Sequence, residues 1–260
     1  MRCTIMNSSY KKLVENLSYL KLNQMAVHLD ETIDFMNNNQ LSFVDTLIKL
    51  TDYEIDMKEI NMVKSMVRVA AFPHLKEIKD FDFSFQPTVN KEQILDFVSL
   101  RFIERKENIV FLGTSGVGKT HLATSIGIAA AKKRTSTYFI KYNDLILNLK
   151  KAKLENRLEA RLKHYAKYKL LIIDEIGYLP IDAEDAKLFF QLIDLRYEQK
   201  STILTTNSNF KSWGDIFQDP KIANAILDRV LHHATVVNIM GDSYRIKDHI
   251  QSENKLDKSS

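Results

Sequence analysis

Three of the chain's seven glycines fall within six residues, in a segment that could hold phosphate. Residues 113–120 read Gly-Thr-Ser-Gly-Val-Gly-Lys-Thr and match the pattern G-x-x-x-x-G-K-[ST] without a mismatch. Glycines let such a loop curl so that consecutive backbone N–H groups point at one anion. Lys119 brings a positive charge to the β- and γ-phosphates, and the hydroxyl of Thr120 can bind Mg²⁺. The pattern therefore predicts a site for ATP and Mg²⁺.

The expected nucleotide-binding set contains the whole loop and the residue after it. Its members are Gly113, Thr114, Ser115, Gly116, Val117, Gly118, Lys119, Thr120 and His121. For His121, packing is the more ordinary role. The alternative for the loop is a tight strand-to-helix turn without a ligand. The apolar stretch 109–112 before it and the helical stretch after it favour the phosphate loop.

A second apolar segment, residues 170–175, reads Leu-Leu-Ile-Ile-Asp-Glu and ends in two acids. We expect Asp174 to hold Mg²⁺ through water, and Glu175 to orient and polarise the water that attacks the γ-phosphate. The alternative is an acid pair that only solvates the end of a strand. Thr120 and Asp174 are thus the candidate metal ligands, and Lys119 and Glu175 are candidate catalytic residues.

From residue 91 onward, short apolar segments alternate with helical stretches. The expected strands are 109–112, 138–140, 170–174, 202–205 and 236–239. This alternation predicts an α/β fold with a five-stranded parallel sheet flanked by helices.

Asn207 follows the fourth expected strand. We expect this strand to lie between the phosphate-loop strand and the acidic strand, where Asn207 could contact both γ-phosphate and water. Asn207 is therefore a further catalytic candidate. The alternative is an asparagine that ends a strand by turn chemistry.

The first part of the chain has a different character. Residues 1–71 contain no Gly or Pro and predict a small helical bundle for contacts with a partner or with DNA. Within it, Thr51 and Glu54 form a capping-box pattern, which predicts a helix from there to about residue 71. Residues 72–90 are irregular and rich in Phe, which predicts a linker strapped onto the next domain. We assign 91–250 to the ATPase domain and 251–260 to a polar tail.

The net charge of the 260 residues is only +4, but residues 132–169 hold twelve Lys and Arg against three Asp and Glu. Lys150, Lys153, Arg157 and Arg161 follow helical spacing and could track the backbone of duplex DNA without reading its sequence. The alternative is a solvated helix face, helped by neighbouring glutamates.

Several classes of protein are disfavoured. Cys3 is the only cysteine, so no intrachain disulfide forms and a reducing, cytoplasmic setting fits. No apolar run reaches the length of a membrane span, and the N-terminus lacks a secretory signal. His232 and His233 are adjacent and would diverge by about 100° on a helix, so we expect no zinc site.

Together these segments resemble the IstB family, the ATPase helper proteins of insertion-sequence transposition, which are related to DnaC-type helicase loaders. The resemblance covers roughly residues 10–250 and includes AAFPHLKEIKDFDFSFQP in the linker. The motifs that carry it are FLGTSGVGKTHLATSIG, LLIIDEIGYLP, ILTTNSNF, AILDRVLHHA and GDSYR.

The resemblance implies an AAA+ core without a separate lid domain. It implies a homo-oligomer formed with ATP on duplex DNA, and a transposase as partner. It also implies that Arg229 reaches a neighbour's γ-phosphate as an arginine finger; the alternative is a surface arginine paired with an acid. Arg245 is the position of a second nucleotide sensor.

Three other functions remain open at this point. A replicative helicase loader would share the ATPase and differ in its partner. A small-molecule phosphotransferase would need an acceptor pocket and an Arg-rich lid, which we do not find in the sequence. A nucleotide switch without turnover is disfavoured by Glu175.

Overall fold

The computed structural model describes residues 2–178 and 182–246, so the polar tail expected at 251–260 lies outside the described residues. The chain separates into two compact units, residues 1–65 and 66–260, and the boundary falls within one long helix. None of the helices in the described ranges combines the length and apolar content needed to cross a membrane.

The first unit is helical and has a small apolar core. Its helices are α1 (Arg2–Tyr19), α2 (Asn23–Val27), α3 (Leu29–Asn39) and the long α4 (Phe43–Val69), which continues into the second unit. The buried apolar side chains of this core are Leu17, Met25, Leu29 and Leu50. The expectation of helices throughout this segment is confirmed.

The capping box expected at Thr51 and Glu54 is wrong, because both residues lie inside α4. The helix begins instead at Phe43, where the hydroxyl of Ser42 accepts the backbone N–H of Asp45 at 3.1 Å and donates to its carboxylate at 2.6 Å. The Glu54 carboxylate accepts the N–H of Gln24 at 2.8 Å. Glu54 thus accepts a hydrogen bond from the first turn of another helix, α2. A local sequence pattern cannot reveal such a tertiary contact.

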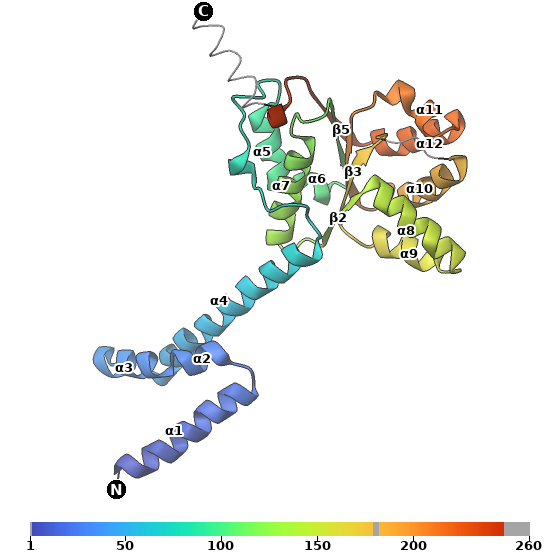
Figure 1. Ribbon diagram of the computed structural model, residues 1–260. Coiled ribbons are helices and arrows are strands. Elements are labelled where there is room, and N and C mark those ends of the chain that lie inside the picture. The colour runs from blue at the N-terminus through green and yellow to red at the C-terminus, as the bar shows by residue number, and fades with distance from the viewer. Residues whose placement is uncertain (1, 179–181, 247–260) are drawn as a thin grey trace, which may run out of the picture. The chain divides into compact units, whose positions relative to one another are not determined.

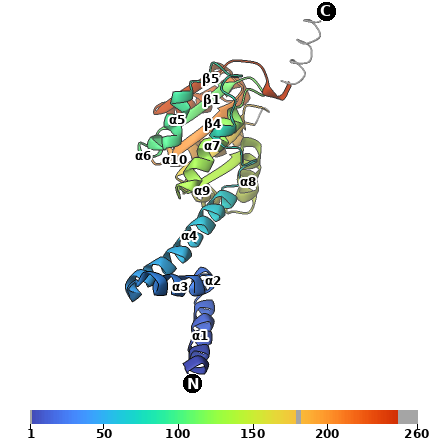
Figure 2. The same ribbon diagram turned by 90° about the vertical axis from the view of Figure 1, so that its left-hand side faces the viewer.

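The second unit is built on a five-stranded parallel sheet with the order β2-β3-β4-β1-β5 (Figures 1 and 2). Its strands are β1 (Asn108–Gly113), β2 (Thr137–Lys141), β3 (Leu170–Ile176), β4 (Ser201–Thr206) and β5 (Ala234–Ile239). All five expected strands are confirmed. As expected, the strand before Asn207 lies between the phosphate-loop strand and the acidic strand.

Helices cover both faces of this sheet (Figure 1). One face carries α5 (Lys91–Ser99), α6 (Arg101–Glu104) and α7 (Lys119–Lys132). The other face carries α8 (Tyr142–Leu154), α9 (Leu158–Ala166), α10 (Ala183–Arg196), α11 (Trp213–Ile216) and α12 (Pro220–Leu231). Every residue of β4 is buried, as expected for a central parallel strand covered on both faces.

Residues 72–90, hereafter the strap, belong to the second unit. The strap contains one turn of 3-10 helix, η1 (Ile78–Asp80), and the buried ring of Phe81 joins the core around α5 and α7. Its later part bonds to the segment after β5: Gln86 Nε2 donates to the carbonyl of Asp242 at 2.7 Å. Beyond β5 the described residues contain only the 3-10 turn η3 (Tyr244–Ile246).

The Arg196 side chain is buried inside the second unit although it carries a charge. Arg196, the last residue of α10, is 2 % exposed, and burial lowers its pKa to about 9, which leaves the guanidinium charged at neutral pH. It donates five hydrogen bonds, all to neutral oxygens. The acceptors are the carbonyls of Tyr165, Ala166, Tyr168 and Ser201 and the hydroxyl of Thr202. Arg196 thus ties the end of α9 to the start of β4.

Candidate nucleotide site

The phosphate loop joins β1 to α7 in a shape that glycine makes possible. Gly118 has φ +98°, in the left-handed region, and a Cβ there would lie 2.6 Å from the Phe81 ring. A Cβ at Gly113 would lie 2.3 Å from the carbonyl oxygen of Ile239. Both positions therefore exclude a side chain. At Gly118 the backbone conformation and the Phe81 ring exclude it, and at Gly113 the backbone of Ile239 excludes it. The loop leads into the N-terminus of α7, whose free N–H groups favour an anion.

Lys119 lies over the loop. Its ammonium donates to the carbonyls of Gly113 and Thr114, each at 2.7 Å. Burial lowers the pKa of Lys119, whereas the nearby Asp174 carboxylate raises it and the positive charge of Arg245 lowers it. Lys119 therefore sits within electrostatic reach of the acidic strand on one side and of Arg245 on the other, as a phosphate-binding cation requires.

The two expected metal ligands contact each other. The hydroxyl of Thr120 donates to the Asp174 carboxylate at 2.9 Å, and Thr205 on β4 donates to the same carboxylate at 2.5 Å. Asp174 is 1 % exposed, and burial raises its pKa while the two hydroxyl bonds lower it. A carboxylate and a hydroxyl are hard oxygen ligands of the kind Mg²⁺ prefers, so this pair fits that ion. Thr205 was not expected from the sequence.

Glu175 departs from regular strand geometry. The pairing of β3 with β4 shifts register between Ile173 and Ile176, and Glu175 has φ +64°. Its backbone N–H donates to the hydroxyl of Thr205 at 2.9 Å. This irregularity turns the Glu175 side chain away from the direction that strand alternation would give it, toward the end of β2.

The Glu175 carboxylate forms an ion pair that the sequence did not indicate. Lys141, the last residue of β2, lies 2.9 Å from it, and this contact raises the pKa of Lys141. Both side chains are partly exposed, at 52 % for Lys141 and 39 % for Glu175. The candidate base, Glu175, is therefore paired with the solvent-accessible ammonium of Lys141.

These groups line one cavity of about 540 Å³, a size typical of small-molecule sites. Loop residues 115–120, Asp174 and Glu175 line it, and so do Asn207 and Arg245. The sequence had indicated each of these, and the structure brings them together.

The strap supplies another wall of the cavity. His74, Lys76 and Phe81 line it beside His121, whose ring packs edge-on against His74 and Phe81. Burial lowers the pKa of both His74 and His121, so the rings are uncharged near neutral pH. Aromatic and uncharged surfaces of this kind suit a nucleotide base. The sequence of the strap had not indicated that it forms part of the site.

Arg229 lies outside this cavity, on α12. Its Nε atom is 2.7 Å from the Asp194 carboxylate, and its guanidinium lies 4.6 Å from the centre of the Phe190 ring. The structure thus shows the paired surface arginine that was the alternative, and a side chain that does not reach its own chain's phosphate loop.

The basic residues expected to contact DNA lie on two helices. Lys150 and Lys153 belong to α8, Arg157 is the N-cap of α9, and Arg161 lies within α9. The turn between the helices passes through Asn156, whose φ is +53°.

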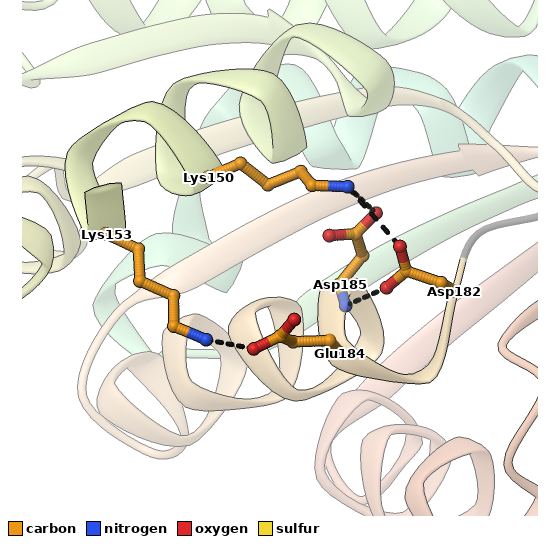
Figure 3. A network of polar contacts seen from close by, with 5 residues as sticks. All are labelled: Lys150, Lys153, Asp182, Glu184 and Asp185. Atoms are coloured by element: carbon orange, nitrogen blue, oxygen red, sulfur yellow. Dashed lines mark hydrogen bonds and ion pairs between the residues drawn. The ribbon is translucent and has the colours of Figure 1, made fainter.

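Acids at the start of α10 pair with the two lysines (Figure 3). Lys150 lies 2.9 Å from Asp185 and 3.4 Å from Asp182, and Lys153 pairs with Glu184. These contacts raise the pKa of Lys150 and lower the pKa of Glu184. The lysines are therefore partly neutralised within the chain.

Comparison with known proteins gives the family. The family described as IstB-like ATP binding protein matches residues 15–252. A relative from Bacillus thuringiensis subsp. berliner, named as an ATP-binding protein of insertion sequence IS232, is 75 % identical over 96 % of this chain and 100 % of its own length. One from Pseudomonas aeruginosa, named for insertion sequence IS21 and ATP binding, is 40 % identical over 89 % of this chain and 88 % of its own length.

Solved structures agree on the fold. The DnaC helicase loader is similar with a TM-score of 0.51 and 27 % identity, over 57 % of this chain and 87 % of the other. DnaA from Aquifex aeolicus with bound AMPPCP shares the fold with a TM-score of 0.53 and 18 % identity, over 71 % of this chain and 57 % of the other. The core is thus an AAA+ P-loop fold, and the chain belongs to the IstB-like family of ATP-binding proteins.

Proposed function

We propose that this protein hydrolyses ATP as a homo-oligomer on duplex DNA and thereby recruits or stimulates the transposase of its insertion sequence. The observation that supports hydrolysis is the position of Glu175. Its carboxylate lines the same cavity as the phosphate loop, Asp174 and Asn207. A binding switch without turnover would not need an acid at that point.

The residues that line the cavity have different roles in hydrolysis. Lys119 and the loop N–H groups hold the phosphates, and Asn207 orients the attacking water. Glu175 takes a proton from that water as it attacks in line with the bond to the leaving group. Thr120 and Asp174 would hold Mg²⁺, which would supply positive charge to the phosphate oxygens. The Lys141 ammonium lies 2.9 Å from the Glu175 carboxylate, so this ion pair must open for the carboxylate to turn toward the attacking water.

The position of Arg229 supports a role as an arginine finger that acts on a neighbouring subunit. Since its guanidinium lies outside its own cavity, it is free to act on a neighbour's γ-phosphate once the Asp194 pair opens. A planar cation there neutralises charge that develops in the transition state. Hydrolysis would then require assembly, which couples turnover to the formation of the oligomer.

DNA would bind through Lys150, Lys153, Arg157 and Arg161. Phosphates of the backbone compete there with Asp182, Glu184 and Asp185 for the two lysines. Binding therefore exchanges intramolecular ion pairs for contacts with phosphate, and it releases counterions as well. The insertion-sequence relatives support the transposase as partner. The similarity to DnaC supports a second candidate, the loading of a replicative helicase.

The test is the ATPase rate with and without random-sequence duplex DNA, with particle size followed in each nucleotide state. We expect ATP and DNA together to drive assembly and to raise turnover. Glu175→Gln should bind ATP and stay assembled on DNA without turnover, whereas Asp96→Asn, a change at an exposed acid paired with Arg101, should behave as wild type. Turnover at the wild-type rate in Glu175→Gln would contradict the assigned base, and co-purification with the transposase or the helicase separates the two partners.

A further inference from the structure

Three side chains that ATP hydrolysis leaves unused meet where α10 and α12 end. Glu198 follows α10, and His232 and His233 follow α12. The expectation that the two histidines diverge is wrong, since their ring centroids lie 4.0 Å apart. His232 itself keeps helical backbone angles, φ −51° and ψ −45°, so the rotation of the backbone does not decide where the rings lie; the side-chain torsions bring the two rings together.

The distances in this cluster match those around a tetrahedral ion. Glu198 Oε1 lies 3.6 Å from His232 Nδ1 and 3.4 Å from His233 Nε2. One ligand atom from each of the three residues lies within 4.8 Å of the other two. Around four-coordinate Zn²⁺, bonds of about 2.0–2.1 Å place neighbouring ligand atoms about 3.3–3.4 Å apart. The two carboxylate–imidazole distances are already close to that value, and the two imidazoles need only small side-chain rotations.

The surroundings of the cluster are balanced in charge and open to solvent. Besides Glu198 itself, the charged groups that act on the adjacent Tyr197 hydroxyl are Asp228, which is negative, and Arg229, which is positive. The three candidate ligands are about half exposed, so an ion can enter and a water molecule can complete the coordination. The Tyr197 hydroxyl lies 2.6 Å from His232 Nδ1 and must give up that hydrogen bond when the nitrogen binds metal.

We propose that Glu198, His232 and His233 form a binding site for a transition-metal ion of the Zn²⁺ type, with water as the fourth ligand. The ion would cross-link the end of α10 to the start of β5. Arg229 belongs to α12 and precedes His233 by four residues, so the ion would also fix the end of the helix that carries the candidate arginine finger. The site is separate from the nucleotide cavity and does not depend on ATP hydrolysis.

The test uses the full chain without a histidine tag or nucleotide, titrated with Co²⁺ as a spectroscopic probe. We expect one ion per chain with the visible absorption of four-coordinate Co²⁺, displaced by Zn²⁺. Glu198→Gln and His233→Asn should each lose that absorption. His28→Ala should keep it, because His28 pairs with Glu31 at 3.2 Å and offers one imidazole only.

Tyr197→Phe should keep the ion too, since the phenol is not a ligand in this proposal. The side chains of Glu198 and His233 are about half exposed, and circular dichroism checks that each variant is folded. The proposal is overturned if wild type shows no four-coordinate absorption, if Glu198→Gln or His233→Asn retains it, or if Tyr197→Phe loses it.

Discussion

Replacement of Arg196 by Met should destabilise the second unit strongly. Met keeps the apolar volume of the stem, but it leaves four buried carbonyls and one hydroxyl without their donor. At about 1 kcal/mol for each hydrogen bond, the gross loss is about 5 kcal/mol. Part of it is recovered, because the folded state no longer buries a charge. We expect a net loss of about 3 kcal/mol in the free energy of unfolding.

The fluorescence of Trp213 gives the assay for this prediction. It is the only tryptophan of the chain and is fully buried in the second unit. For a unit of this size, about 3 kcal/mol corresponds to a fall in Tm of about 6–12 °C. Arg101→Met, which removes an exposed pair with Asp96, should leave Tm unchanged. A wild-type Tm for Arg196→Met would show that the carbonyls find other donors, and it would refute the reasoning.

Three further changes test the proposed function. Lys141→Ala should raise ATP turnover without DNA about two- to fivefold, as expected from the loss of a partly exposed ion pair; a steady-state rate at or below wild type would count against a restraining role for Lys141. Arg229→Ala should bind ATP normally but hydrolyse it about 10³-fold more slowly, and full activity in the assembled state would exclude the finger. Glu184→Gln should tighten duplex DNA binding about threefold by freeing Lys153, and an unchanged affinity in fluorescence anisotropy would mean that the lysine does not contact DNA.

The fold and the chemical centre could be predicted because they depend on local patterns. Five apolar segments of strand length alternate with helices, and parallel strands bring their carboxyl ends to one edge. The phosphate loop, Asp174 and Asn207 must then lie together. This is why even the position of β4 between β1 and β3 could be expected before the structure was known.

The remaining contacts could not be predicted because each joins segments far apart in the chain. Lys141 reads as one more residue of a basic stretch, and only the pairing of β2 with β3 places it beside Glu175. The acids that neutralise Lys150 and Lys153 come from another helix. Glu54 fitted a local capping pattern, but its carboxylate serves α2.

Nucleotide binding is coupled to the docking of the strap on the core. Since the strap forms part of the cavity wall, a nucleotide that contacts it stabilises its docked form, by about 2.7 kcal/mol when the ligand concentration is 100 times Kd. Thermodynamic linkage is reciprocal, so a partner that pulls the strap off the core weakens nucleotide binding by the same factor. The state of residues 72–90, which directly follow the helix shared by the two units, thus reports whether the cavity is filled.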